Sequence, residues 1–319
     1  MKKVVVHIGF GKTGTTLFQK HLFKYHPQIN YLGGIRKDNI TSVKPLKKNI
    51  YSLLRAILTH DSCEFDLQFW RSFYEKEIYT KFEKDKINLI SEEWMSLTPV
   101  LLACGDRGLV AQRLFDIFQD DAKIIMFIRN QIDVLRSLYN NHLDVIIPLY
   151  SRDHSWNFRH QFDELMFYKL LIQTADYGIL SNYRYFSLAQ KYFHLFQDNV
   201  SVKLYEDFNR DQVDFLRTLA NEMGINDSSF LENLPEKKVK MSYPKRGMIA
   251  EMKKLFAQNI HPDVFKGTDV FSGNYQGLKN ISSNEANNFV FEYFQENNRK
   301  MSNLIKVDLA EYGYPVWKG

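Results

Sequence analysis

The sequence predicts an α/β fold of three layers, in which a central, mainly parallel sheet is flanked by helices and helical insertions. Two observations predict it. Short and continuously apolar runs are typical of strands that are buried on both faces, and segments with helical spacing separate these runs along the chain. With 45% hydrophobic and 25% charged residues, the 319-residue chain has the composition of an ordinary globular protein.

The predicted strands are four apolar runs, "VVVHI", "INLIS", "KIIMFI" and "VSVKLY", at 4–8, 87–91, 123–128 and 200–205. Helical spacing of apolar residues predicts helices over about 17–25, 109–119, 187–196 and 282–305. Two long, aromatic-rich stretches, about 35–86 and 140–185, are mostly helical in pattern. Because no repeat or low-complexity linker divides the chain, we expect residues 1–319 to form a single domain with these two stretches as insertions.

Charge and cysteine content argue against several classes of protein. The 42 Lys and Arg exceed the 37 Asp and Glu by a net charge of only +5, and the charges are dispersed, so nothing favours a nucleic-acid partner. Cys63 and Cys104 are too few for a disulfide framework or a structural zinc site. No apolar stretch reaches about 18 residues, which argues against a membrane helix. The first apolar run stops at Ile8 and is too short for the core of a signal peptide. We therefore expect a cytoplasmic protein with free thiols and no stable membrane insertion, whose oligomeric state the sequence leaves open.

The first strand runs into a glycine- and threonine-rich loop, "GFGKTGTT" at 9–16, which leads into the first helix. Backbone N–H groups and the helix dipole at such a junction attract a phosphate-like group. A triphosphate-binding loop has the pattern G-x-x-x-x-G-K-[ST]. That pattern would require glycine at residue 6, but Val6 lies there, within the predicted strand. The loop is therefore short and suits a smaller terminal anion than a triphosphate.

This loop resembles the 5′-phosphosulfate-binding loop of the sulfotransferases that use 3′-phosphoadenosine 5′-phosphosulfate (PAPS), in which a Lys or Arg precedes Ser/Thr-Gly-Thr-Thr. The resemblance is to bacterial-type, carbohydrate sulfotransferase-like members, and it implies a P-loop-like fold. It also implies that Lys12 holds the phosphosulfate and the leaving oxygen, and that neighbouring backbone and hydroxyl groups bind the same co-substrate: Gly11, Thr13, Gly14, Thr15 and Thr16. The product would be 3′-phosphoadenosine 5′-phosphate (PAP), and no metal would be required.

A second motif of this family, an Arg at the end of a strand and a Ser eight residues later, binds the 3′-phosphate of the donor. Arg129 ends the predicted strand 123–128, and Ser137 follows at that spacing. If Asn130 caps the next helix, Ser137 lies about two helical turns further on and returns to the same face. Arg129 and Ser137 would then converge on one phosphate.

Two later segments also resemble this family. "VSVKLYEDFNRDQVDFLRTLANEMGI" at 200–225 is similar to its strand-Tyr-Glu-Asp segment and the helix that follows. "VKMSYPKRGMIAEM" at 239–252 loosely resembles its late basic loop, which approaches the 3′-phosphate. The matching positions imply three more donor-binding residues, Lys245, Arg246 and Gly247.

Sulfuryl transfer also requires a group that takes the proton of the acceptor hydroxyl. Glu92 and Glu93 follow the predicted strand 87–91, at the strand end where α/β proteins gather their chemistry. The family carries a His or Glu at the matching strand end, which makes Glu92 the expected base and Glu93 the second choice, while a histidine base stays open. His142, His154 and Trp156 are weaker candidates for the acceptor side, the last two within "SRDHSWNF", whose polar and aromatic mix is typical of a sugar-binding surface.

Together these residues predict a sulfotransferase that moves the sulfuryl group of PAPS, by in-line transfer, to a hydroxyl of a carbohydrate or glycolipid. Two alternatives remain. The same loop chemistry would serve a small-molecule kinase that uses ATP and Mg²⁺, or a non-catalytic module that only binds a nucleotide. Magnesium dependence would favour the kinase, and donor binding without transfer would favour the binding module.

Overall fold

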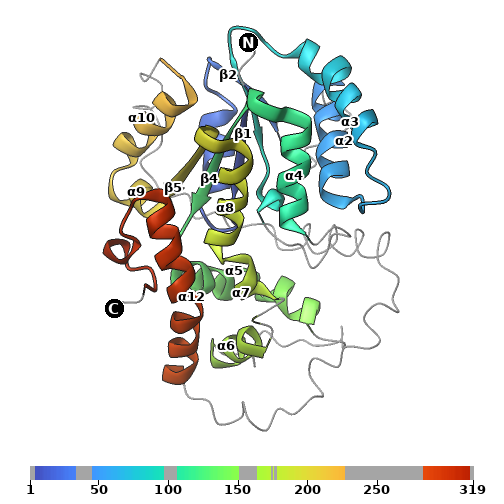
Figure 1. Cartoon of the computed structure of the whole chain (residues 1–319). Coiled ribbons are helices and arrows are strands. Elements are labelled where there is room, and N and C mark those ends of the chain that lie inside the picture. Colours follow the sequence, from blue (N-terminus) through green and yellow to red (C-terminus); the bar gives the residue numbers. More distant parts are fainter. Residues whose placement is uncertain are drawn as a thin grey trace. The chain divides into compact units, whose positions relative to one another are not determined.

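The computed structural model describes residues 4–33, 45–96, 106–150, 164–173, 175, 178–226 and 283–316 (Figure 1). The chain divides into two compact units. The first consists of Met1–Arg129 and Ser187–Lys240, and the second of Asn130–Phe186 and Met241–Gly319. The single domain expected from the sequence remains a prediction.

The first unit is built on a five-stranded parallel sheet with the strand order β2-β3-β1-β4-β5. The strands are β1 (Val4–Gly9), β2 (Ile29–Gly33), β3 (Ile87–Ser91), β4 (Ala122–Ile128) and β5 (Val200–Leu204). The four predicted strands are confirmed, each within one residue at either end. β1, β3 and β4 are almost wholly buried, which is why their sequences are continuously apolar.

The fifth strand, β2, is not predicted by the sequence because it lies at an edge of the sheet. It pairs with β3, and its register shifts between Tyr31 and Gly33. Ile29 and Leu32 are buried, whereas Asn30 and Tyr31 are half-buried. A short strand with this mixed burial has no continuous apolar run by which it could be recognised.

Helices on one face of the sheet enclose an aromatic core. α1 (Thr15–Leu17) and the π-helix η1 (Phe18–Phe23) follow β1, and α9 (Tyr205–Arg210) and α10 (Gln212–Met223) follow β5. The Phe18 ring centroid lies 4.9 Å from that of Phe127, 5.1 Å from that of Phe208 and 5.8 Å from that of Phe215. Such rings contribute both buried area and edge-to-face attraction. The helix predicted over about 17–25 is present, but most of it is wound as a π-helix.

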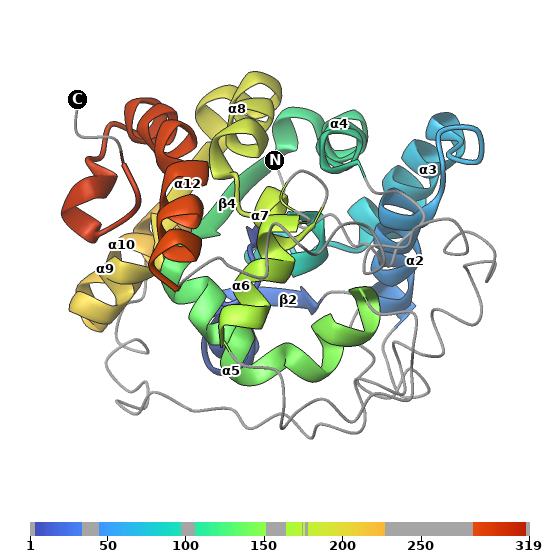
Figure 2. The ribbon, with the colours of Figure 1, turned by 90° about the horizontal axis from the view of Figure 1, so that it is seen from below.

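The opposite face carries α4 (Arg107–Phe118) and α8 (Tyr185–Phe196), with α2 (Pro45–Thr59) and α3 (Leu67–Phe73) beyond α4 (Figures 1 and 2). Lys191 Nζ of α8 donates to Gln112 Oε1 of α4 at 3.0 Å. The buried Arg113 of α4 donates to the carbonyl oxygens of Ile57 at 3.0 Å and His60 at 2.7 Å, at the end of α2. The helices predicted over 109–119 and 187–196 are confirmed. Short turns complete this unit: η3 (Tyr74–Ile78), η4 (Tyr79–Lys81), η5 (Glu93–Met95), η6 (Gln119–Asp121) and η8 (Gln197–Asn199).

The second unit is helical in its described part. It contains α5 (Gln131–Tyr150), α6 (Glu164–Gln173), α7 (Ile179–Asn182), α12 (Ser283–Ile305) and the 3₁₀ turn η11 (Leu309–Tyr312). The buried amides of Gln131 and Asn298 exchange two hydrogen bonds of 2.7 and 3.0 Å, and Asn298 also donates to Pro315 O at 2.8 Å. This paired network joins the start of α5 to α12 and to the segment after it. The helix predicted over 282–305 is confirmed.

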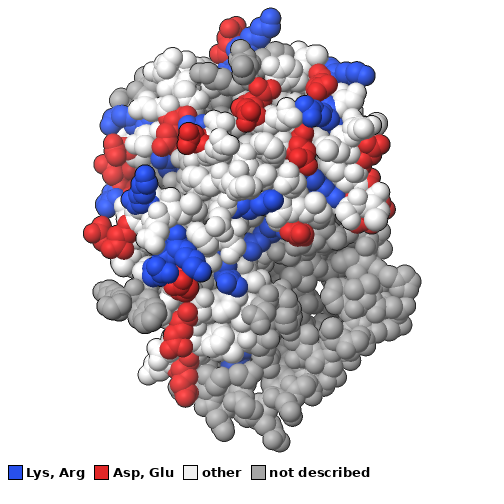
Figure 3. Space-filling model, in the orientation of Figure 1, with Lys and Arg blue, Asp and Glu red and all other residues white. Residues whose placement is uncertain are grey.

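Charged side chains of both signs are interspersed on the face drawn in Figure 3. Several of the ion pairs join residues three or four positions apart on one helix, such as Lys81 with Glu77 at 2.6 Å and Arg299 with Glu296 at 2.7 Å. Exposed pairs of this kind contribute little to stability. Among the helices that the structure describes, none has the length and apolar character needed to cross a bilayer.

Candidate functional site

The carboxyl ends of β1, β3 and β4 meet at one edge of the sheet, where the strand order reverses around β1. β1 pairs with β3 on one side and with β4 on the other, and Gly9 at its end lies opposite Phe127. In open parallel sheets, ligands bind outside the strand ends at such a reversal. The loop that follows Gly9 is therefore flanked by Glu92 after β3 and by Arg129 after β4.

The loop is a tight turn that its own hydrogen bonds hold. Thr13 Oγ1 donates to Phe10 O at 2.6 Å, and Thr13 N–H donates to the same oxygen at 3.3 Å. Thr13 and Thr15 are turned inward and buried. Lys12 has a φ of 73° and Gly14 a φ of 80°, both in the left-handed region. A lysine in this conformation is strained, which is typical of loops whose shape serves a ligand.

Two glycines allow the turn to close because a side chain would collide with its neighbours. A Cβ on Gly9 would lie 2.1 Å from Thr15 Oγ1, and a Cβ on Gly14 would lie 2.8 Å from the Tyr205 ring. Because Gly9 has no Cβ, the Thr15 side chain at the start of α1 can approach the end of β1 closely. Because Gly14 has none, the loop can lie close to the Tyr205 ring at the start of α9.

Arg129 is bound directly to the loop. Its Nη1 donates to the carbonyl oxygen of Lys12 at 3.0 Å, and its guanidinium lies 4.6 Å from the centroid of the Tyr205 ring. Stacking on an aromatic ring and bonding to a carbonyl both restrict the arginine to one orientation. Lys12, Gly14, Arg129 and Tyr205 therefore form one cluster at the end of β1. The sequence indicated the segment around Tyr205 but assigned this side chain no part in the site.

The two candidate bases differ in burial. Glu92 is 4% exposed, whereas Glu93 is half-buried and begins η5. Ser96 Oγ, one turn later, donates to Gly9 O at 2.8 Å and to Glu93 O at 2.9 Å. The turn that carries both carboxylates is thus tied to the end of β1, next to the loop.

Other predicted site residues belong to the second unit or lie outside the described residues. Asn130 Oδ1 accepts from Ile132 N at 2.9 Å, which confirms that Asn130 caps α5. Ser137 is half-buried on this helix, and its convergence with Arg129 stays a prediction. His142 belongs to the same helix, but its side chain is not described. Five residues lie outside the described residues altogether: His154, Trp156, Lys245, Arg246 and Gly247.

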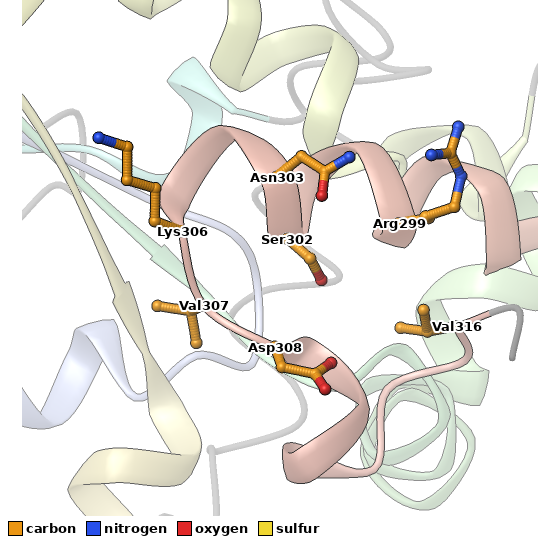
Figure 4. Close-up of a pocket in the computed structure, with 7 residues that line it drawn as sticks. All are labelled: Arg299, Ser302, Asn303, Lys306, Val307, Asp308 and Val316. Carbon is orange, nitrogen blue, oxygen red and sulfur yellow. The ribbon is translucent and has the colours of Figure 1, made fainter.

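The second unit has an open depression of about 480 Å³ that contains none of the predicted site residues. Arg299, Ser302 and Lys306 line it from α12 and the residue after it, with Asp308 and Val316 (Figure 4). Its polar groups hold the local backbone: Ser302 Oγ accepts from Leu309 N at 3.1 Å, and Asp308 Oδ1 accepts from Ala310 N at 2.9 Å. The depression is therefore explained by the packing of η11 on α12 and gives no reason to assign a ligand.

A buried histidine lies beneath the loop, at a position to which the sequence gave no role. His7 is fully buried in β1, and its Nδ1 lies 2.7 Å from Ser91 Oγ. Its ring meets Phe127 and Phe23 edge to face, with centroid distances of 4.4 and 5.5 Å. Burial lowers the pKa of His7 from 6.5 to about 3, so the ring is uncharged at neutral pH. The only signal in the sequence is a histidine within an otherwise apolar strand.

This buried ring predicts that the free energy of unfolding depends on pH. Because the pKa of His7 is about 3 when folded and 6.5 when exposed, the unfolded chain binds one more proton between these values. Stability is therefore complete above pH 6.5 and falls as the pH decreases, by up to about 1.4 kcal/mol per pH unit. The free energy of unfolding can be measured with urea between pH 7.5 and 5 for the wild type and for His7→Phe. Phenylalanine at residue 7 takes up no proton, so the difference between the two pH profiles isolates the contribution of His7. Parallel curves for the two proteins would contradict the prediction.

Comparison with solved structures identifies proteins of similar fold. A sulfotransferase from Alicyclobacillus acidocaldarius aligns over 98% of this chain and 99% of its own, with a TM-score of 0.52 and 17% sequence identity. Mouse sulfotransferase SULT7A1, solved as a complex with PAP, aligns over 96% of this chain and 89% of its own, with a TM-score of 0.39 and 15% identity. No family model and no curated protein matches the sequence. The first likeness confirms the predicted fold class: a P-loop-like α/β fold with a parallel sheet between layers of helices.

Proposed function

We propose that this protein is a sulfotransferase that transfers the sulfuryl group of PAPS to an acceptor hydroxyl. The observation that carries the proposal is the cluster at the end of β1. There a short loop with a basic residue, Lys12, has its backbone held by a second basic residue, Arg129. This arrangement, in a fold shared with a sulfotransferase, supplies cations for a donor that has both a 5′-phosphosulfate and a 3′-phosphate.

The loop geometry fits a phosphosulfate because the turn is narrow and the buried Thr13 hydroxyl holds its shape. With Thr13 bonded to Phe10 O and Gly9 leaving no space beneath, the loop has a fixed and compact shape. Four loop residues are half-buried and so accessible in part: Gly11, Lys12, Gly14 and Thr16. A preorganised turn with one adjacent cation suits the terminal anionic group of the donor.

In the proposed reaction the acceptor oxygen forms a bond to sulfur while the bond between sulfur and the 5′-phosphate oxygen breaks. Glu92 takes the proton of the acceptor hydroxyl, with Glu93 as the second choice. Lys12 stabilises the charge that grows on the departing phosphate oxygen, and PAP leaves. The proposed scheme needs no metal ion. The Glu92 carboxylate accepts the proton, and the Lys12 ammonium group stabilises the negative charge on the leaving phosphate oxygen.

Donor recognition is proposed to continue at the 3′-phosphate, held by Arg129 and Ser137 and, after them, by Lys245, Arg246 and Gly247. The hydrogen bond from Arg129 to Lys12 O supports the role proposed for Arg129, because it places the guanidinium beside the loop. For the acceptor we propose a carbohydrate or glycolipid hydroxyl, on the sequence evidence of the polar and aromatic mix of "SRDHSWNF" at 151–158. We also propose that the enzyme is cytoplasmic and forms a single domain, with the stretches at about 35–86 and 140–185 as insertions.

Two observations oppose the kinase alternative. Val6, where a triphosphate loop needs its first glycine, lies within β1 and pairs with Ile90 and Ile124. In that loop the Ser or Thr after the lysine binds Mg²⁺, whereas the Thr13 hydroxyl here is buried and donates to Phe10 O. Both argue against a magnesium-bound triphosphate.

The proposal is tested by binding and by transfer. In a thermal-shift experiment PAP at 100 times its dissociation constant should stabilise the protein by about 2.7 kcal/mol, and ATP with Mg²⁺ should not. Incubation with ³⁵S-labelled PAPS and a panel of monosaccharides, glycolipids and simple phenols should then label an acceptor. Stabilisation by ATP with Mg²⁺ but not by PAP would refute the sulfotransferase, and binding of PAP without any transfer would identify a non-catalytic module.

A further inference from the structure

The peptide bond that joins Ser91 to Glu92 is held at both of its polar ends by residues on either side of the loop. Its N–H, that of Glu92, donates to His7 O at 3.0 Å. Its carbonyl oxygen, that of Ser91, accepts from Gln19 Nε2 at 3.3 Å. His7 precedes the loop in β1, and Gln19 follows it in η1. The peptide plane immediately before the candidate base is therefore fixed to both ends of the loop.

Side chains of the same three residues form a second layer of bonds. Ser91 Oγ accepts from Gln19 Nε2 at 2.9 Å and lies 2.7 Å from His7 Nδ1. Ser91 and His7 are both fully buried. In the described part of the chain no atom bonds to His7 Nε2, so the ring is retained at the cost of one buried unpaired group. A phenylalanine would avoid that cost but would lose the bond to Ser91 Oγ.

The geometry of η1 brings Gln19 to this position. Gln19 is the second residue of a π-helix of six residues that begins directly after α1. A π-helix is rare and, where it occurs, often marks a functional site, because its wider turn redirects side chains. Here it accompanies an amide that reaches across to the end of β3. Gln19 lies only three residues after Thr16, the last residue of the loop.

We propose that Gln19, Ser91 and His7 are positioning residues that fix Glu92 relative to the phosphosulfate loop. The inference rests on the proposed function and deepens it. A proton acceptor must be held within about half an ångström of its productive place, and Glu92 lies on a different strand from the loop. The four bonds join these two parts of the site, and the bond from Ser96 Oγ to Gly9 O adds a further connection after Glu92.

The test compares Gln19→Met with Gln112→Met. Methionine keeps the length of the side chain and removes its donor. Gln112 is a matched control on α4, away from the loop: its amide also makes two hydrogen bonds, donating to Asp116 at 3.0 Å and accepting from Lys191 at 3.0 Å. With ³⁵S-labelled PAPS and the panel acceptor that the wild type sulfates fastest, Gln19→Met should lower kcat about tenfold, because it removes two neutral hydrogen bonds. Its affinity for PAP should equal that of the wild type, and Gln112→Met should retain both values.

A double-mutant cycle with Glu92→Gln separates positioning from general damage. If Gln19 acts through Glu92, Gln19→Met should lower kcat no further once the carboxylate is gone. An equal loss in both backgrounds, or a loss of PAP affinity, would overturn the inference. Should Gln19→Met fail to fold, Ser91→Ala against Ser91→Thr repeats the comparison, since threonine keeps the hydroxyl and should restore kcat. A wild type that neither binds PAP nor transfers sulfate refutes the proposed function itself, and this inference with it.

Discussion

Lys12→Ala is expected to lower kcat with PAPS by about 10²- to 10³-fold, the cost of removing one preorganised charge-stabilising group from a site. Charge grows on the 5′-phosphate oxygen as its bond to sulfur breaks, and Lys12 is the basic residue of the loop itself. The backbone should persist, because the carbonyl oxygen that accepts from Arg129 remains in the variant. Turnover of ³⁵S-labelled PAPS and calorimetric binding of PAP measure the two effects separately, and kcat should fall far more than affinity.

Two further variants define what the lysine contributes. Lys12→Arg keeps a positive charge and should retain more activity than Lys12→Ala. Lys24→Ala removes an exposed lysine beyond η1, near the Tyr25 ring, and should leave turnover unchanged. If Lys12→Ala kept more than a tenth of the wild-type kcat, Lys12 would not stabilise the leaving group.

Arg129→Ala is expected to weaken PAP binding about 10- to 100-fold, since a hydrogen bond to a charged group contributes about 1.5–3 kcal/mol. Two functions of Arg129 contribute to this loss: the proposed contact with the 3′-phosphate, and the bond to Lys12 O together with stacking on Tyr205. Calorimetry with PAP and with adenosine 5′-monophosphate, which lacks the 3′-phosphate, distinguishes them. If Arg129 binds the 3′-phosphate, the variant should lose the wild type's preference for PAP.

A different result for Arg129→Ala would contradict the 3′-phosphate assignment. If the variant binds PAP and adenosine 5′-monophosphate more weakly by the same factor, Arg129 only supports the loop and does not bind the 3′-phosphate. Arg210→Ala is a matched control, because Arg210 lies in the same unit, is 68% exposed and pairs with Asp207 within α9. Its affinity for both nucleotides should equal that of the wild type.

Much of the fold could be predicted because the central strands are buried on both faces. Burial on both faces favours a mainly apolar run, and β1, β3 and β4 each have one, interrupted by His7 in β1 and by Asn88 in β3. The same reasoning fails for β2, where Asn30 and Tyr31 are half-buried at the sheet edge. It also fails for the winding of η1, because a π-helix and an α-helix have similar apolar spacing over a few residues.

The candidate site was predictable where function depends on residues close together in the chain. The short loop around Lys12 and the cap at Asn130 are local patterns, and a local pattern has few possible geometries. Contacts such as Arg129 with Tyr205, or Ser96 Oγ with Gly9 O, join residues far apart in sequence. No local pattern specifies such a pair, since each partner alone has an ordinary residue type for its position.

The sequence by itself determined the parallel sheet and the short glycine- and threonine-rich loop after β1, because hydrophobic burial and glycine-dependent turns are encoded over a few consecutive residues. Only the tertiary structure decided that Arg129 holds the backbone of Lys12, and that His7, Ser91 and Gln19 hold the peptide before Glu92. The physical reason is that these bonds depend on the order and register of strands. Chain neighbours do not fix that order, which follows from how the sheet and its helices pack.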